Sequence, residues 1–173
     1  FFAMSSENMN RPREETEFIS ILLNNSIKKY LPELLDNQIK FMVIGDISHL
    51  PEQIKTTIKY AEEVTSKFTK YKLNIAYNYG GQWDIVNSIN TLLNKKLTIS
   101  YENLSKYLST GNDFPDLIVR TGGYKRLSNF MLWQASYSEL IFLETLWPDF
   151  SSSDVSNILD NYKSIKRKFG KVD

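Results

Sequence analysis

Short apolar runs alternate with longer amphipathic segments along the chain. The apolar runs occupy residues 1–4, 40–44, 73–79, 116–119 and 140–143. Apolar residues recur at helical spacing in the segments between them, and this alternation is typical of a sheet of parallel strands flanked by helices. The pattern therefore predicts an α/β fold with a mostly parallel sheet.

The predicted helices have recognisable starts and apolar stripes. Prolines 12 and 51 stand where a first-turn proline is favoured, and further helices are expected near 81–93, 100–108 and 153–168. We expect Pro32 to end the first of them. Its inward face is predicted from helical spacing to be Phe18, Ile21, Leu22, Ile27 and Tyr30. Residues 1–173 contain no repeat or linker and are expected to form a single domain.

Three of the predicted strands end in glycine or polar residues. The clusters lie at 45–46, 78–81 and 120–123. Because ligands bind at the carboxyl ends of the strands in open parallel sheets, we expect these clusters to converge on one site.

Composition limits the chemistry available to that site. The 173 residues include 21 basic and 20 acidic side chains, so the net charge of +1 argues against a general nucleic-acid binder. There is no cysteine and only one histidine, which excludes thiolate metal sites and multi-histidine metal sites. No apolar run approaches the length that spans a bilayer.

The segment 120–128, RTGGYKRLS, carries the strongest chemical signal. Arg120 and Arg126 flank a Gly-Gly turn, and Ser128 follows. Guanidinium groups match phosphate oxygens in bidentate fashion, and glycines let backbone N–H groups approach an anion closely. A helix beginning near Asn129 would add its positive end. The segment is therefore interpreted as a diphosphate clamp, with a surface turn carrying two arginines as the alternative.

Three further places carry candidate chemistry. Glu139, just before the last predicted strand, could hold Mg²⁺ or be an ordinary exposed glutamate. The segment 5–11, SSENMNR, reads as a substrate-binding loop or as a helix cap. Asp84 follows Trp83 at a helix start, where its negative charge would interact favourably with the positive end of the helix dipole.

Motifs in all these places together resemble a known family. They are FAMSSENMNRP at 2–12, IGD at 44–46, NIAYNYGGQWDI at 74–85, DLIVRTGGYKRLSNF at 116–130, WQ at 133–134, YSEL at 137–140 and WPDF at 147–150. In this order and spacing they resemble the cis-prenyltransferases, the undecaprenyl diphosphate synthase-like enzymes. The resemblance implies that family's α/β fold, with an apolar tunnel for the growing chain.

The resemblance also implies a reaction and its participants. Isopentenyl diphosphate would be condensed with an allylic diphosphate such as farnesyl diphosphate to give a polyprenyl diphosphate with cis double bonds. The enzyme would use Mg²⁺ and form a homodimer. It would be cytoplasmic, with peripheral membrane contact, and would supply a lipid carrier for cell-wall or glycan assembly. No nucleic acid would be involved.

Residue roles follow from the same resemblance. Asn8 matches the asparagine assigned to proton removal, and Glu139 matches a metal-associated carboxylate. The expected substrate-binding residues are Ser5, Ser6, Glu7, Met9, Arg11, Arg120, Arg126, Leu127 and Ser128.

The sequence also departs from the family pattern. Met9 replaces a usual tryptophan, Gln82 a usual arginine, and Lys168 the first residue of an Arg-x-Gly motif; Tyr124 and Lys125 follow the Gly pair where Glu and His or Gln are common. The family's Asp-Gly-Asn-Gly-Arg-Trp loop, which binds the allylic diphosphate, would precede Phe1. We therefore expect an N-terminally truncated chain that is inactive alone. A non-catalytic partner subunit of a heteromeric enzyme is the alternative.

Overall fold

The computed structural model describes residues 1–167, and the expected Arg-x-Gly position at Lys168 lies outside this range. The helical elements and strands alternate as the sequence pattern predicts. In chain order they are η1 Ser6–Asn10, α1 Arg13–Asp36, β1 Ile39–Ile44, α2 Glu52–Thr65, β2 Tyr71–Ala76, α3 Gly81–Asn94, α4 Tyr101–Tyr107, β3 Leu117–Arg120, η2 Gln134–Tyr137, β4 Glu139–Phe142, η3 Trp147–Asp149 and α5 Ser152–Ser164.

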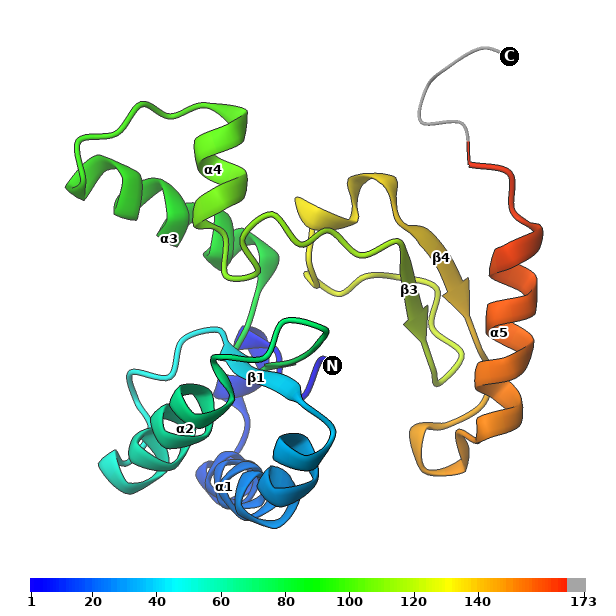
Figure 1. The fold of residues 1–173 in the computed structure, drawn as a ribbon, viewed down its shortest axis with the longest axis horizontal. Coiled ribbons are helices and arrows are strands. Elements are labelled where there is room, and N and C mark those ends of the chain that lie inside the picture. Colours follow the sequence, from blue (N-terminus) through cyan, green and yellow to red (C-terminus); the bar gives the residue numbers. More distant parts are fainter. Residues whose placement is uncertain (168–173) are drawn as a thin grey trace.

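All strand pairing among the described residues is parallel, in two pairs. Strand β1 pairs with β2, and β3 pairs with β4. The segment 1–5 runs beside β2 through isolated parallel bridges from Phe2 to Ala76 and from Ser5 to Tyr79. The predicted strand at 1–4 is therefore a bridged extended segment. In Figure 1, β1 lies near α1 and α2 in one part of the molecule, and the β3–β4 pair lies beside α5 in another.

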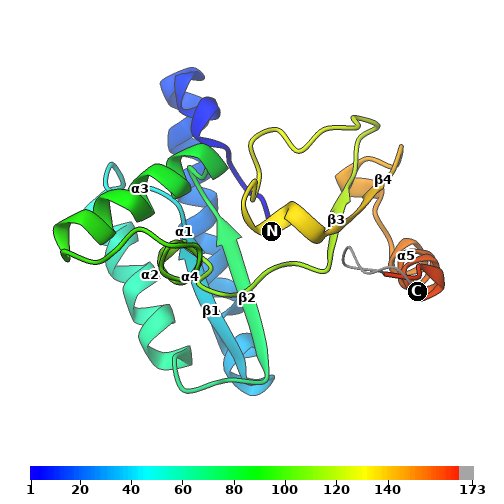
Figure 2. The same ribbon diagram turned by 90° about the horizontal axis from the view of Figure 1, so that it is seen from above.

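The main core lies between α1, α2 and the first strand pair. Leu23 and Ile27 of α1, Phe41 of β1 and Ile58 of α2 are buried there together. Figure 2 shows the two helices alongside the paired strands β1 and β2. The polar clusters at 45–46 and 78–81 follow the carboxyl ends of β1 and β2, whereas the cluster at 120–123 belongs to the separate β3–β4 pair.

Helix α1 differs from the prediction in two ways. It continues through Pro32 to Asp36, because Leu31 and Leu34 on either side of the proline both pack on the core. The gain from burying them offsets the lost backbone hydrogen bond. The predicted inward face is also wrong for Phe18, Ile21, Leu22 and Tyr30, which are exposed, whereas Ser20, Leu23, Ile27 and Leu34 are buried.

Gly45, directly after β1, is expected to be important for stability. Its φ is +116°, and a Cβ at this position would lie 2.1 Å from the carbonyl oxygen of Tyr77. Gly45→Ala should lower the free energy of unfolding by about 3 kcal/mol, measured by urea denaturation, because backbone strain adds to this overlap. Gly111→Ala is the matched control: its φ is +60°, but the nearest atom to an added Cβ is 3.8 Å away. Equal losses in the two variants would contradict the overlap at Gly45.

Candidate diphosphate-binding site

The two arginines singled out from the sequence lie close together after β3. The Arg120 Nη1 donates hydrogen bonds to Ser128 Oγ at 2.8 Å and to the carbonyl oxygen of Arg126. The Tyr124 ring contacts both guanidinium groups, with its centroid 5.7 Å from Arg120 Cζ and 4.2 Å from Arg126 Cζ. The predicted convergence of Arg120, Arg126 and Ser128 is therefore confirmed, and Leu127 lies half-buried between them in the chain.

This cluster concentrates positive charge at a rim of the sheet. Within residues 1–167, neither Arg120 nor Arg126 forms an ion pair with a carboxylate. Two guanidinium groups against one ring, with a hydroxyl beside them, offer several donors to an anion with multiple oxygens.

Two other parts of the predicted clamp are wrong. The Gly122 N–H donates to the Thr145 carbonyl and the Gly123 N–H to the Leu143 carbonyl, each at 2.9 Å, so the glycine amides are already used. The chain after Ser128 forms turns rather than a helix, with Ser128, Asn129 and Met131 at positive φ. The donors in this loop are therefore the side chains, and no helix end contributes.

The segment 5–11 lies beside the arginine loop, as the convergence of strand ends predicts. The Ser6 N–H donates to the Tyr79 carbonyl at 2.9 Å, and Glu7 Oε1 accepts from Asn129 Nδ2 at 2.7 Å. The hydrogen bond from Asn129 lowers the pKa of Glu7 below its ordinary value. Stabilisation by the ionised carboxylate is therefore present at neutral pH and lost as pH falls through this lowered pKa.

The remaining candidates of this segment have other contacts. Asn8 Oδ1 accepts from the Ser5 N–H at 3.2 Å and so helps to cap η1. Met9 packs against the main core. The Arg11 Nη1 forms an ion pair with Glu15 Oε2 on α1, at 3.5 Å. The structure thus ties Glu7 directly to the arginine loop, whereas Met9 and Arg11 face α1 and the core.

Glu139 lies at the opposite end of its strand pair from Arg120. It is in register with Leu117, the first residue of β3, and its Oε1 is 4.0 Å from Arg167 Nε. Among residues 1–167, no three acidic or histidine side chains group together as a metal site. The described residues do not form a magnesium site by themselves, and Mg²⁺ stays a prediction.

The buried Asp84 carboxylate joins several loops through hydrogen bonds, and the sequence pattern does not identify this role. Asp84 Oδ1 accepts from the backbone N–H and hydroxyl of Ser109, at 2.9 and 2.7 Å. Asp84 Oδ2 accepts from Tyr79 Oη at 2.9 Å and from Gln134 Nε2 at 3.0 Å. Burial and the neighbouring Asp84 raise the pKa of Tyr79, so its hydroxyl remains a donor. Asp84 lies in the motif at 74–85 and Gln134 in the motif at 133–134, but their spacing along the chain does not show that the two side chains meet.

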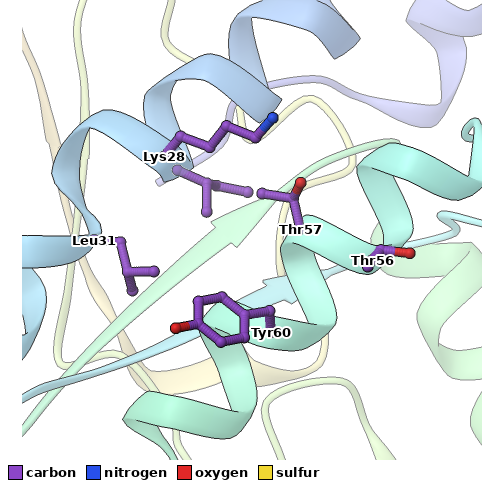
Figure 3. A pocket seen from close by; sticks show the side chains of 6 residues that line it. Lys28, Leu31, Thr56, Thr57 and Tyr60 are labelled. Carbon is purple, nitrogen blue, oxygen red and sulfur yellow. The ribbon is translucent and has the colours of Figure 1, made fainter.

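A pocket between α1 and α2 contains none of the candidate residues. It has a volume of about 360 Å³ and is lined by Ile27, Lys28, Leu31, Thr56, Thr57 and Tyr60 (Figure 3). The hydroxyls of Thr56 and Thr57 donate to carbonyls of their own helix. This pocket therefore offers little directed chemistry. No helix within residues 1–167 is both long enough and apolar enough to cross a membrane.

The chain is thus an α/β protein with parallel strand pairs, in which β3 ends at Arg120 and the loop after it carries Arg126. The family model described as putative undecaprenyl diphosphate synthase matches residues 1–170. The chain therefore belongs to the undecaprenyl diphosphate synthase family of prenyltransferases, which confirms the resemblance found in the sequence.

Relatives agree on this family. The chain is 42% identical to a ditrans,polycis-undecaprenyl-diphosphate synthase specific for (2E,6E)-farnesyl diphosphate from Buchnera aphidicola, over 98% of this chain and 70% of the relative. It is 40% identical to an isoprenyl transferase from Fusobacterium nucleatum, over 99% of this chain and 75% of the relative. These names are those of enzymes and give no support to the partner-subunit alternative.

Solved structures support the fold. A probable undecaprenyl diphosphate synthase from Campylobacter jejuni matches with a TM-score of 0.91 and 36% identity, over 98% of this chain and 81% of that one. Lavandulyl diphosphate synthase from Lavandula x intermedia, in complex with dimethylallyl diphosphate, matches with a TM-score of 0.89 and 33% identity, over 98% and 77%. The predicted α/β fold class is confirmed.

Proposed function

We propose that the protein that carries this sequence performs cis-prenyl elongation, condensing isopentenyl diphosphate with a farnesyl-type allylic diphosphate. The observation that carries the proposal is the cluster of Arg120, Arg126 and Ser128 around the Tyr124 ring. Its guanidinium groups, which form no ion pair with a carboxylate within residues 1–167, suit the isopentenyl diphosphate group, and the names of the relatives supply the reaction class.

The bond changes follow from the substrates. The allylic carbon–oxygen bond breaks and diphosphate leaves with its electron pair. The terminal alkene carbon of isopentenyl diphosphate then bonds to the allylic carbon, and a proton leaves the carbon next to the new cation to form the new double bond. Fixed donors lower the barrier by holding the two reacting carbons together.

The residues divide this work between two loops. Arg120, Arg126 and Ser128 would hold the isopentenyl diphosphate group. Asn8 would act at proton removal; because an amide is a weak base, it would guide the proton by hydrogen bonding. Glu7, which is tied to the arginine loop through Asn129, would keep Asn8 at that site.

The proposal includes participants that the resemblance predicts. Mg²⁺ would be held with Glu139 and would stabilise charge on the departing diphosphate. The enzyme would be a homodimer with peripheral membrane contact, and its product would serve as a lipid carrier for cell-wall assembly.

The defining experiment measures condensation by the full chain that carries this sequence. Radiolabelled isopentenyl diphosphate is supplied with farnesyl diphosphate and Mg²⁺, and the extracted lipid is sized by chromatography. Control reactions omit the allylic substrate or replace Mg²⁺ with EDTA. Absence of a labelled polyprenyl product, in a preparation that is folded, would contradict the proposal.

Arg126→Ala tests the isopentenyl diphosphate assignment. We expect the KM for isopentenyl diphosphate to rise about ten- to a hundredfold, since a charge-assisted hydrogen bond to an anion is lost. The KM for farnesyl diphosphate should change much less. Steady-state kinetics with each substrate varied in turn measures both, and an unchanged KM for isopentenyl diphosphate would remove Arg126 from the site.

A further inference from the structure

Asn129 connects three loops that end at the candidate site. Its carbonyl oxygen accepts from the Gly81 N–H at 2.6 Å, and its Oδ1 accepts from the Gln82 N–H at 3.0 Å. Its Nδ2 donates to Glu7 Oε1 at 2.7 Å. One residue of the arginine loop therefore bonds both to the start of α3 and to the turn η1 that carries Asn8.

The backbone conformation of Asn129 allows it to contact both the start of α3 and Glu7. Its φ is +62°, in the left-handed region that asparagine and aspartate tolerate better than other side chains. Ser6 and Asn129 pack closely against Gly80, since a Cβ placed on Gly80 would lie 2.5 Å from Ser6 Oγ and 2.7 Å from Asn129 Nδ2. The three loops are thus in direct contact at this point.

We propose that Asn129 is a positioning residue that fixes the turn Ser6–Asn10 relative to Arg120 and Ser128. This inference rests on the proposed function, in which those two loops supply the proton-removal and diphosphate-binding residues. Asn129 holds the loops in register through Glu7 without itself contacting substrate. Loss of this contact separates Asn8 from the bound isopentenyl group.

Asn129→Asp isolates the contact with Glu7 from the contacts with α3. Aspartate tolerates the left-handed backbone and keeps an oxygen for the Gln82 N–H. It replaces only the Nδ2 donor, and it sets a second carboxylate against Glu7. A role limited to capping α3 predicts that this variant behaves like the wild type.

The expected result is a loss of function with little loss of fold. In Asn129→Asp, kcat with isopentenyl diphosphate should fall at least thirtyfold, and backbone amides of residues 6–10 should exchange with deuterium at least tenfold faster. The midpoint of urea unfolding should stay near that of the wild type.

A second substitution rebuilds the bond in the reverse direction. In the double variant Asn129→Asp with Glu7→Gln, the glutamine Nε2 can donate to the new carboxylate. We expect kcat to recover at least tenfold from that of Asn129→Asp, and exchange at residues 6–10 to slow again. Glu7→Gln alone completes the double-mutant cycle, because its Oε1 can still accept from Asn129.

Two outcomes would overturn the inference. One is unchanged exchange at residues 6–10 in Asn129→Asp; the other is a double variant whose exchange and kcat are no better than those of Asn129→Asp. The exchange measurement needs no catalysis. A wild type that fails to condense its substrates while exchange follows the cycle would therefore contradict the proposed function and leave the connection through Asn129 standing.

Discussion

Replacing Arg120 with alanine is expected to lower kcat/KM for isopentenyl diphosphate by about a thousandfold. Its guanidinium would contact the diphosphate, and it also donates to Ser128 Oγ and to the Arg126 carbonyl. Alanine therefore removes one charged donor and releases two other members of the cluster. A charge-assisted bond contributes about 1.5–3 kcal/mol, and the added disorder of Ser128 and Arg126 brings the total near 4 kcal/mol.

The comparison variants separate charge from geometry. Arg120→Lys keeps the charge but loses the planar fork, so it should recover only a small part of the lost activity. Lys125→Ala, an exposed change in the same loop, should leave kcat/KM within about twofold. If Arg120→Ala loses less than threefold, or no more than Lys125→Ala, then Arg120 does not organise the site.

Sequence reasoning located the strands of the second sheet to within one residue. The predicted runs 116–119 and 140–143 correspond to β3 Leu117–Arg120 and β4 Glu139–Phe142. Short apolar runs bounded by glycine or polar residues have few alternative structures, and the two arginines then share a loop because only five residues separate them. Convergence of Arg120 with Arg126 was therefore predictable.

The use of hydrogen-bonding groups was not predictable in the same way. The Gly122 and Gly123 amides looked available to an anion, but the chain after β4 supplies carbonyls at Leu143 and Thr145. A local motif cannot show which distant backbone will pair with it. Glu139 is a different case: it precedes its strand, and because β3 and β4 are parallel, the start of β4 lies beside Leu117 rather than Arg120.

Helix α1 shows the corresponding limit for apolar faces. More than one stripe of apolar residues satisfies helical spacing in this segment. The contacts of α1 with β1 and α2 select Leu23, Ile27 and Leu34 as the buried set, which leaves Phe18 and Leu22 exposed. Periodicity predicted the helix, whereas its orientation depends on the surfaces against which it packs.

The Asp84 carboxylate is expected to be the most important polar group for stability. Asp84, Tyr79 and Gln134 are each at most 2% exposed, so water cannot replace a lost partner. Asp84→Ala would remove the acceptor from four hydrogen bonds. It would leave the Tyr79 hydroxyl without its acceptor in the interior, and the Gln134 Nε2 would keep only its 3.3 Å bond to Thr110 Oγ1. We expect the free energy of unfolding to fall by about 4 kcal/mol, measured by urea denaturation.

Asp84→Asn tests whether stability depends on the charge of this side chain or on its shape and hydrogen bonds. Gln134 Oε1 is buried without a hydrogen-bond partner, so a rotated Gln134 amide can accept from an asparagine Nδ2. Asp84→Asn should therefore lose only about 1–2 kcal/mol. Asp154, whose carboxylate accepts from the Ser151 N–H in an exposed hydrogen bond at the start of α5, supplies the control, and Asp154→Ala should lose about 1 kcal/mol. If Asp84→Ala loses no more than Asp154→Ala, the four hydrogen bonds to Asp84 do not hold together the loops that they connect, and another contact must position them.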